Sequence, residues 1–160
     1  MVDKDVIIHG QGSEKTTVQA HAIAEDAEDR VFRIGPDSSV TIESMTIRHG
    51  RPTNCPRSGG GILNEGTLRL QDCIVTKNTG SAGGGLLNNG TLTLVNCTVS
   101  DNVADGHGGE NAMGKGSGGG IKNMVGALTI ANSTISGNRS AHNGGGIKVS
   151  CSGTLDMVNS

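Results

Sequence analysis

The sequence predicts an all-β solenoid, in which about five or six coils of three short strands stack along one axis. The first observation is an internal repeat: Gly-Gly-Gly followed by an aliphatic residue begins similar segments at residues 59, 83, 118 and 144. The second is composition, since 27 glycines and one aromatic residue, Phe32, suit a narrow core with tight corners. A repeat with so thin an apolar face cannot bury that face alone, so stacking has to supply the core.

Apolar residues alternate within each repeat, which indicates strands with one buried face. In the first regular copy, Leu68 and Leu70 alternate, and Cys73 and Val75 continue after a step that breaks the period. This shift would turn the later side chains outward unless the chain bends between the two pairs. The bend is expected at Asp72, because Asp and Asn tolerate left-handed backbone conformations. The equivalent positions in later copies are Asn96, Asn132 and Asn159.

Amide side chains recur at a second fixed place in the repeat. Asn64, Asn88 and Asn123 each lie two residues after the aliphatic residue that follows a Gly triplet, and Val149 takes this place in the last copy. Equivalent residues of stacked coils lie directly above one another. We therefore expect structural ladders of hydrogen-bonded side chains, both here and at the corner positions Asp72, Asn96, Asn132 and Asn159.

We expect residues 1–160 to form one domain. Residues 1–30 make a degenerate first coil with an acidic loop, and residues 31–160 make the regular coils. From one Gly triplet to the next, the coils are 24, 35 and 26 residues long, so one corner varies in length. The longest excursion is a loop at residues 101–117, and function often resides on such loops.

Neither end of the chain shows a capping helix. An uncapped stack exposes strand edges that invite pairing with another chain. We therefore expect a segment of a longer protein, whose open end coils stack on further coils or on another chain.

The repeats resemble the right-handed parallel β-helix of the pectin-lyase-like superfamily. Residues 59–68, Gly-Gly-Gly-Ile-Leu-Asn-Glu-Gly-Thr-Leu, are similar to the Gly-Gly-Gly-Ile-x-Asn-x-Gly-Thr-Leu repeats of bacterial secreted and surface proteins and of polymorphic outer-membrane proteins. The Phe-x-x-Asn half of that motif is absent. The resemblance implies a right-handed coil and an extracellular or cell-surface location, while the sequence itself contains no signal-peptide pattern.

The net charge of −2 gives no reason to expect a nucleic acid partner or attraction to anionic membranes. No apolar run approaches the roughly 20 residues that span a bilayer, so we expect no transmembrane segment. The partners expected from the resemblance are a polysaccharide or another protein surface.

Charged side chains gather on two loops. Residues 48–58 carry three arginines and a histidine, which would suit a small anion or an acidic sugar. The loop at 101–117 carries carboxylates and an imidazole, but their spacing matches no calcium loop. We expect no metal site and no cofactor. The alternative is a Ca²⁺ site on these loops. The candidate contacts on these loops are Arg48, Arg51, Asp101, Asp105, His107 and Glu110.

The four cysteines predict no disulfide framework. Cys73 and Cys97 occupy the same inward column on adjacent coils, where they are expected to be buried free thiols that act as small apolar residues. Cys55 and Cys151 lie several coils apart, so they are not expected to pair.

Enzymes of this superfamily, as the resemblance implies, act on acidic polysaccharides with clustered aspartates. No column of this chain stacks two or three carboxylates, so we expect no catalytic residues. The leading hypothesis is a non-catalytic stalk, adhesin or scaffold of a secreted or surface protein. One alternative is a polysaccharide lyase or a glycoside hydrolase. The other is a carbohydrate- or ice-binding surface on an outward threonine face, which Arg69, Ala127 and Asp156 interrupt.

Overall fold

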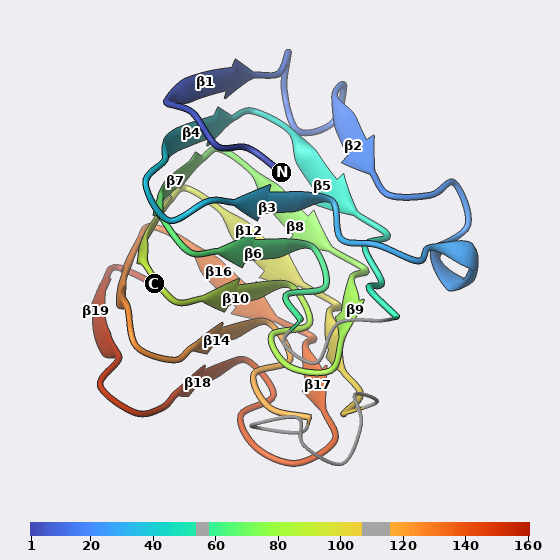
Figure 1. Cartoon of the computed structure of the whole chain (residues 1–160), viewed down its shortest axis with the longest axis vertical. Helices are drawn as coiled ribbons and strands as arrows, with labels where there is room; N and C mark the ends of the chain where they lie inside the picture. Colours follow the sequence, from blue (N-terminus) through green and yellow to red (C-terminus); the bar gives the residue numbers. More distant parts are fainter. Residues whose placement is uncertain (54–57, 107–115) are drawn as a thin grey trace.

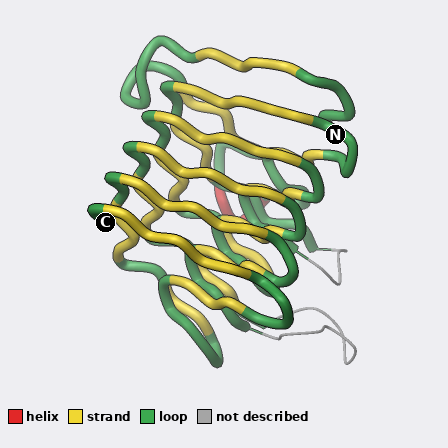
Figure 2. The backbone as a smooth tube through the Cα atoms, turned by 90° about the vertical axis from the view of Figure 1, so that its left-hand side faces the viewer, coloured by secondary structure: helices red, strands yellow, loops and turns green. Residues whose placement is uncertain are grey.

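A computed structural model describes residues 1–53, 58–106 and 116–160, and in it the chain winds as a parallel β-helix (Figure 1). Every named strand pair is parallel and joins one coil to the next. The largest sheet takes one strand from each coil and has six strands, so the predicted stack of five or six coils is confirmed. Figure 2 shows the coils from the side, each offset from its neighbour along the same axis.

Four sheets form the walls of the helix. Sheet 1 contains β1 (Val6–His9), β4 (Ser39–Glu43), β7 (Thr67–Gln71), β11 (Thr91–Val95), β15 (Ala127–Ala131) and β19 (Thr154–Val158). Sheet 2 contains β3 (Phe32–Ile34), β6 (Ile62–Asn64), β10 (Leu86–Asn88), β14 (Ile121–Asn123) and β18 (Ile147–Val149). Sheet 3 contains β2 (Thr17–Gln19), β5 (Thr46–Arg48), β8 (Ile74–Thr76), β12 (Thr98–Ser100) and β16 (Thr134–Ser136). Sheet 4 contains β9 (Thr79–Gly80), β13 (Val103–Ala104) and β17 (Arg139–Ser140).

Sheet 4 differs from the expectation of three strands per coil. Its strands have two residues each, too few to show an alternating pattern, so the sequence assigned them to the variable corner. The expected loop at 101–117 therefore begins later, because Val103–Ala104 is a strand that pairs with Thr79–Gly80. The middle coils have one strand in each of the four sheets, and the largest length difference follows the strand of sheet 4. The segment between sheets 2 and 1 also lengthens, from residues 65–66 after β6 to residues 124–126 after β14.

The core is a narrow column of aliphatic side chains. The inward residues of sheets 1 to 3 are almost fully buried and form one cluster along the axis, as the alternation predicted. Its members in a middle coil include Leu86, Leu92, Leu94 and Val99, each with 0% exposure. Each coil contributes only a few such side chains, so burial depends on the coils above and below. On the uncovered inner side of β19, by contrast, Leu155 is 40% exposed.

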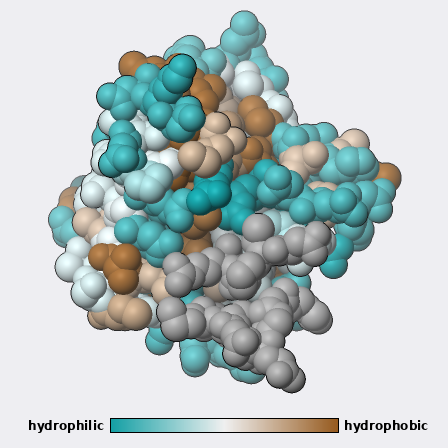
Figure 3. Space-filling view, in the orientation of Figure 1, coloured by the Kyte–Doolittle hydropathy of each residue, from teal (hydrophilic) through white to brown (hydrophobic). Residues whose placement is uncertain are grey.

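The acidic stretch of the first coil lies on the surface, as expected. It contains a short 3-10 helix, η1 (Ala24–Asp26), which bears no buried residue. Hydrophilic residues gather over this projecting part of the molecule, at the right of Figure 3. None of the helical segments in the described ranges has the length and apolar character needed to cross a membrane.

The bends between sheets 1 and 3 use left-handed backbone. Asp72, Asn96, Asn132 and Asn159 have φ between 50° and 54°, at the four places where the sequence predicted a corner. These residue types adopt that conformation at lower cost than other non-glycine residues. The side chains of these residues are exposed, so their backbone makes the bend while the side chains point away from the core.

The next corner, between sheets 3 and 4, supports a stability prediction. Lys77, Asp101 and Gly137 hold equivalent left-handed positions, with φ of 53°, 55° and 63°. A left-handed lysine costs about 1–2 kcal/mol, and glycine removes that cost at an entropic penalty of about 0.5–1 kcal/mol. We expect Lys77→Gly to raise the free energy of unfolding by about 0.5–1 kcal/mol in urea titration. Lys77→Ala, which keeps the strain, should leave it unchanged, and equal effects of the two substitutions would contradict this explanation.

Candidate functional site

The outer surface of sheet 4 is the part of the helix where side chains from different loops converge. Thr79, Val103 and Arg139 are in register on β9, β13 and β17. Thr79 donates its backbone N–H to the carbonyl of Gly50 at 2.9 Å, in the pattern that Val103 repeats with Asn78. This pattern places Arg51 in the same column, one coil before Thr79. Four successive coils thus present one row of outward side chains along the helix axis.

Two pockets lie end to end on this surface. The first has a volume of about 220 Å³ and is lined by Arg51, Pro52, Thr53, Thr79, Gly80, Ser81 and Asp105. The second has a volume of about 230 Å³ and is lined by Val103, Ala104, Asp105, Arg139, Ser140 and Ala141. Asp105 belongs to both, so the pockets form one furrow, which we call the corner groove. It has an arginine toward each end and a carboxylate between them.

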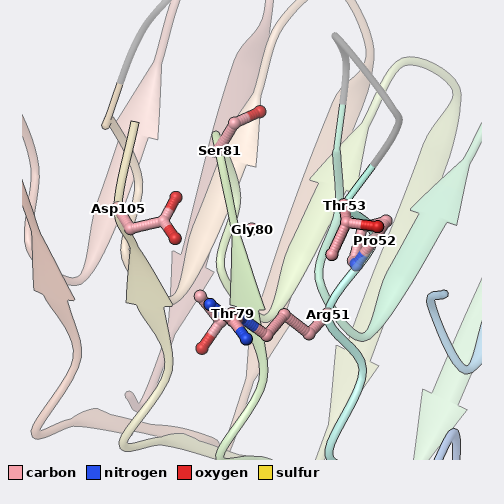
Figure 4. Close-up of a pocket in the computed structure, with 7 residues that line it drawn as sticks. All are labelled: Arg51, Pro52, Thr53, Thr79, Gly80, Ser81 and Asp105. Atoms are coloured by element: carbon pink, nitrogen blue, oxygen red, sulfur yellow. The ribbon is translucent and has the colours of Figure 1, made fainter. Parts of the chain in front are cut away.

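Arg51 and Asp105 come from loops on coils that are not adjacent, yet they line the same pocket. Figure 4 shows the Arg51 side chain extending toward Thr79, while Asp105 directs its carboxylate in from the opposite side. Arg51 donates a hydrogen bond from Nη1 to the carbonyl of Glu25 at 2.8 Å, which ties its side chain to the first coil. The backbone N–H of Asp105 bonds to the carbonyl of Gly80 at 2.9 Å. The backbone N–H of Arg51 bonds to the carbonyl of Asp29 at 2.8 Å, so the scaffold fixes the backbone on both sides of the pocket.

The other candidate loop residues do not join this pocket. Arg48 ends β5 and donates from Nε to Gln19 Oε1 at 2.8 Å, so it pairs with the neighbouring strand of sheet 3. Asp101 forms the left-handed corner before β13. His107 and Glu110 lie outside the described residues. Within the described ranges, no three His, Cys, Asp or Glu side chains gather in a way that could hold a metal ion.

The inner amides of sheet 2 are hydrogen-bonded from coil to coil. Asn64 Nδ2 donates to Asn88 Oδ1 at 2.7 Å, and Asn88 Nδ2 donates to Asn123 Oδ1 at 2.8 Å. All three residues have 0% exposure. The corner residues of sheet 1 differ, because Asn96 Nδ2 donates to Asp72 Oδ1 at 3.2 Å on the exposed surface. Of the residues expected to form ladders, Asn64, Asn88 and Asn123 are thus bonded in a buried row, and Asp72 and Asn96 are bonded at the exposed surface.

A second amide row, buried at Asn78 and Asn102 and half-buried at Asn138, was not predicted from the sequence. Asn78 Nδ2 donates to Asn102 Oδ1 at 3.0 Å, and Asn102 Nδ2 donates to Asn138 Oδ1 at 3.0 Å. The signal was available, since each of these residues follows the inward Cys or Ser of its coil by five positions. This row lies directly before sheet 4. It therefore supports the floor of the corner groove from inside.

A buried lysine lies on the outer side of sheet 2. Lys122 is 2% exposed and pairs in register with Leu87 and Lys148. Burial lowers the pKa of its ammonium group, and the nearby Lys148 lowers it further, while Cys151 opposes the shift. Lys122 does not line the corner groove, and it contributes to the packing of this wall.

One comparison with known proteins identifies a relationship. A family model described as "Right handed beta helix region" matches residues 5–160. No curated protein matches the chain, and no solved structure does.

Proposed function

Because the chain belongs to the right-handed β-helix family, we propose that it is a rigid, non-catalytic interaction module of a secreted or cell-surface bacterial protein, which holds an acidic carbohydrate chain in its corner groove. The observation that carries this proposal is the shared pocket of Arg51 and Asp105. Such a module would serve as an adhesin, a stalk or a scaffold, because the coils hold the groove at a fixed place on a stiff body.

The chemistry of the groove fits a carboxylated sugar. An arginine binds a carboxylate through paired, charge-assisted hydrogen bonds. The Asp105 carboxylate can accept hydrogen bonds from sugar hydroxyls, and the hydroxyl group of Thr79 can accept or donate them. Arg51 and Arg139 are three coils apart along the row, roughly 14 Å at the usual strand spacing. An extended chain with several carboxylates could therefore engage both arginines.

A specific observation also supports polysaccharide cleavage as the second candidate. The pocket combines a cationic and an acidic side chain, both of which lyases and hydrolases use. Hydrolysis by the usual route needs two carboxyl groups flanking the scissile bond, about 5–9.5 Å apart. Among its lining residues, the first pocket supplies one carboxylate, Asp105. For this reason we favour binding over cleavage.

The test is calorimetric titration with oligogalacturonate, alongside a neutral galactan of similar length. We expect binding of the acidic oligomer only, weakened roughly tenfold or more by Arg51→Gln or Arg139→Gln, because a charge-assisted hydrogen bond contributes about 1.5–3 kcal/mol. Arg69→Gln is the matched control, since Arg69 lies on the outer side of sheet 1 and its loss changes the net charge equally.

Equal weakening by all three variants would mean nonspecific attraction and would contradict a site in the groove. The same mixtures should be assayed for new reducing or unsaturated sugar ends, with and without Ca²⁺. Turnover above a heat-denatured control would replace the binding proposal with the enzymatic one.

A further inference from the structure

The sequence contains two Asn-Gly pairs, Asn89-Gly90 and Asn143-Gly144, which the structure places in different surroundings. Asparagine is a thermolabile residue, because the backbone nitrogen of the next residue can attack its side-chain carbonyl carbon and close a five-membered ring. A following glycine favours this step, since it has no side chain to hinder the nitrogen and its backbone turns freely. Whether a pair reacts then depends on how the fold holds the glycine nitrogen and the amide side chain.

The second pair lies on the corner between β17 and β18. Asn143 and Gly144 are both exposed, and Gly144 has left-handed backbone with φ of 66°. Among the hydrogen bonds of the described residues, none involves the Asn143 side chain and none has the backbone N–H of Gly144 as its donor. The attacking nitrogen and the amide that it attacks are therefore not held apart by bonds to the scaffold.

The carbonyl groups of the same two residues are held by the preceding coil. Asn143 and Gly144 accept hydrogen bonds from the backbone N–H groups of Gly118 and Gly119, at 2.9 and 3.0 Å. These bonds fix the position of the corner, while the Asn143 side chain stays free to rotate about its Cα–Cβ bond. Exposed side chains change rotamer within nanoseconds, so the amide samples positions next to the Gly144 nitrogen many times before it reacts.

The first pair, by contrast, is built into the coil stack. Gly90 donates its backbone N–H to Asn88 Oδ1 at 3.3 Å, and its carbonyl accepts from Asn88 Nδ2 at 3.0 Å. The backbone N–H of Asn89 donates to the carbonyl of Asn64 at 2.8 Å. Before the Gly90 nitrogen can attack, it has to leave its bond with the buried amide row, which requires a local opening of the coil. The fold therefore protects Asn89.

We propose that Asn143 is a site of spontaneous deamidation in the folded protein and that Asn89 is not. The Gly144 nitrogen forms a bond with Cγ of Asn143, and its proton passes through water to Nδ2, which leaves as ammonia. Water then adds to one of the two carbonyl groups of the resulting succinimide, and a ring C–N bond breaks. The product is aspartate or isoaspartate. The reaction consumes one water molecule, releases one ammonia molecule and changes no oxidation state.

The modification changes both the charge and the backbone of this corner. Each product adds a negative charge two residues after Ala141, which lines the corner groove. In isoaspartate the main chain runs through the former side chain, so the oxygen that accepts from Gly118 becomes part of a free carboxylate. The contact between the last two coils is then altered at this corner, whereas the aliphatic core is not involved.

The experiment incubates the full chain at mildly alkaline pH and follows conversion by peptide mapping. Trypsin cuts after Arg139 and Lys148, so Asn143 is recovered in the peptide 140–148, in which it is the one amide side chain. Tandem mass spectrometry follows Asn89 in the same digests. In the folded protein we expect conversion at Asn143 to be at least about tenfold faster, because a hydrogen bond has to open first at the other pair.

Two controls test whether the fold causes the difference. In the urea-unfolded chain the two pairs should react at similar rates, since both are Asn-Gly. Asn143→Gln keeps an exposed amide but requires a larger ring, so it should abolish conversion at residue 143 and leave the rate at Asn89 unchanged. The proposal is overturned if the two pairs react at equal rates in the folded protein. It is also overturned if Asn143 reacts only after unfolding, because the fold would then protect both pairs.

Discussion

Replacing Gly84 with alanine is expected to disrupt the coil stack and to lower the free energy of unfolding by about 4 kcal/mol or more, beyond the 1–3 kcal/mol typical of overpacking. A Cβ atom at Gly84 would meet the backbone carbonyl oxygens of Val103 and Gly119 well inside van der Waals contact. The Gly119 oxygen accepts a hydrogen bond from the backbone N–H of Gly85 at 3.2 Å, so moving it away would weaken a bond between the two coils. Gly84 has an ordinary backbone conformation, so the effect is steric.

The chain offers a matched control for this substitution. Gly145 is the equivalent glycine two coils later, and the carbonyl oxygen of Asn138, 3.1 Å from its hypothetical Cβ, is the nearest atom that the added carbon would meet. Gly145→Ala should therefore cost less than about 1 kcal/mol, as expected for an ordinary surface substitution. Thermal and urea unfolding of the two variants check the prediction. Similar losses at both positions would show that close coil contact is not what requires glycine at this place.

The second large effect is expected at the centre of the sheet 2 amide row. Asn88 Nδ2 donates to Asn123 Oδ1 and to the carbonyl of Ala127, at 2.8 and 3.1 Å, while its Oδ1 accepts from Asn64 Nδ2 at 2.7 Å. Asn88→Ala opens a cavity and removes one partner from each neighbouring amide: Asn64 Nδ2 keeps the carbonyl of Thr91 at 2.9 Å, whereas Asn123 Oδ1 loses the Asn88 donor. A lost hydrogen bond costs about 0.5–1.5 kcal/mol and an unsatisfied buried group about 1–3 kcal/mol, so we expect a total loss of about 2–4 kcal/mol.

Asn88→Asp separates hydrogen bonding from volume, because it keeps the shape and replaces the NH₂ donor with an acceptor. It should be at least as destabilising as alanine at neutral pH, since it buries a charge without a cationic partner. Asn89→Ala is the neighbouring control, because this side chain is only half buried, and it should change stability by less than about 1 kcal/mol. Urea unfolding of the three variants decides the matter. A mild Asn88→Ala phenotype would mean that the amide row adds little to the stability of the stack.

The repeat was sufficient to predict the strands of sheets 1 to 3, because its geometry is strict. Every coil must place the same side chains at the same height, so Leu92 and Leu94 recur in register with Leu68 and Leu70. The left-handed corners between sheets 1 and 3 were also predictable, because Asp and Asn recur there and few residue types tolerate that conformation. The corner at Lys77 was not, since lysine gives no such signal. Sheet 4 was not, since a pair such as Thr79–Gly80 carries no periodicity, and its strand character comes from the coil beside it.

The corner groove shows a different limit of sequence reasoning. Arg51 and Asp105 were both recognised as loop residues with useful chemistry, but nothing in the sequence places them in one pocket. Their proximity depends on sheet 4, whose register brings the ends of separate loops to one surface. The second amide row, by contrast, was detectable from its constant spacing, and a wider search for recurring polar residues would have found Asn102.

The largest length difference between coils falls in the loop that follows the strand of sheet 4, whereas the strands themselves stay in register. The coil that leaves after Val103–Ala104 is about eleven residues longer than its predecessor, yet the strands on both sides keep perfect register. Doubling a flexible loop costs only about 0.6 kcal/mol in closure entropy. Insertions at this edge are therefore expected to have little effect on whether the protein folds, and they would alter the surface next to the proposed binding groove. A library randomised only there would explore new ligands on an unchanged frame.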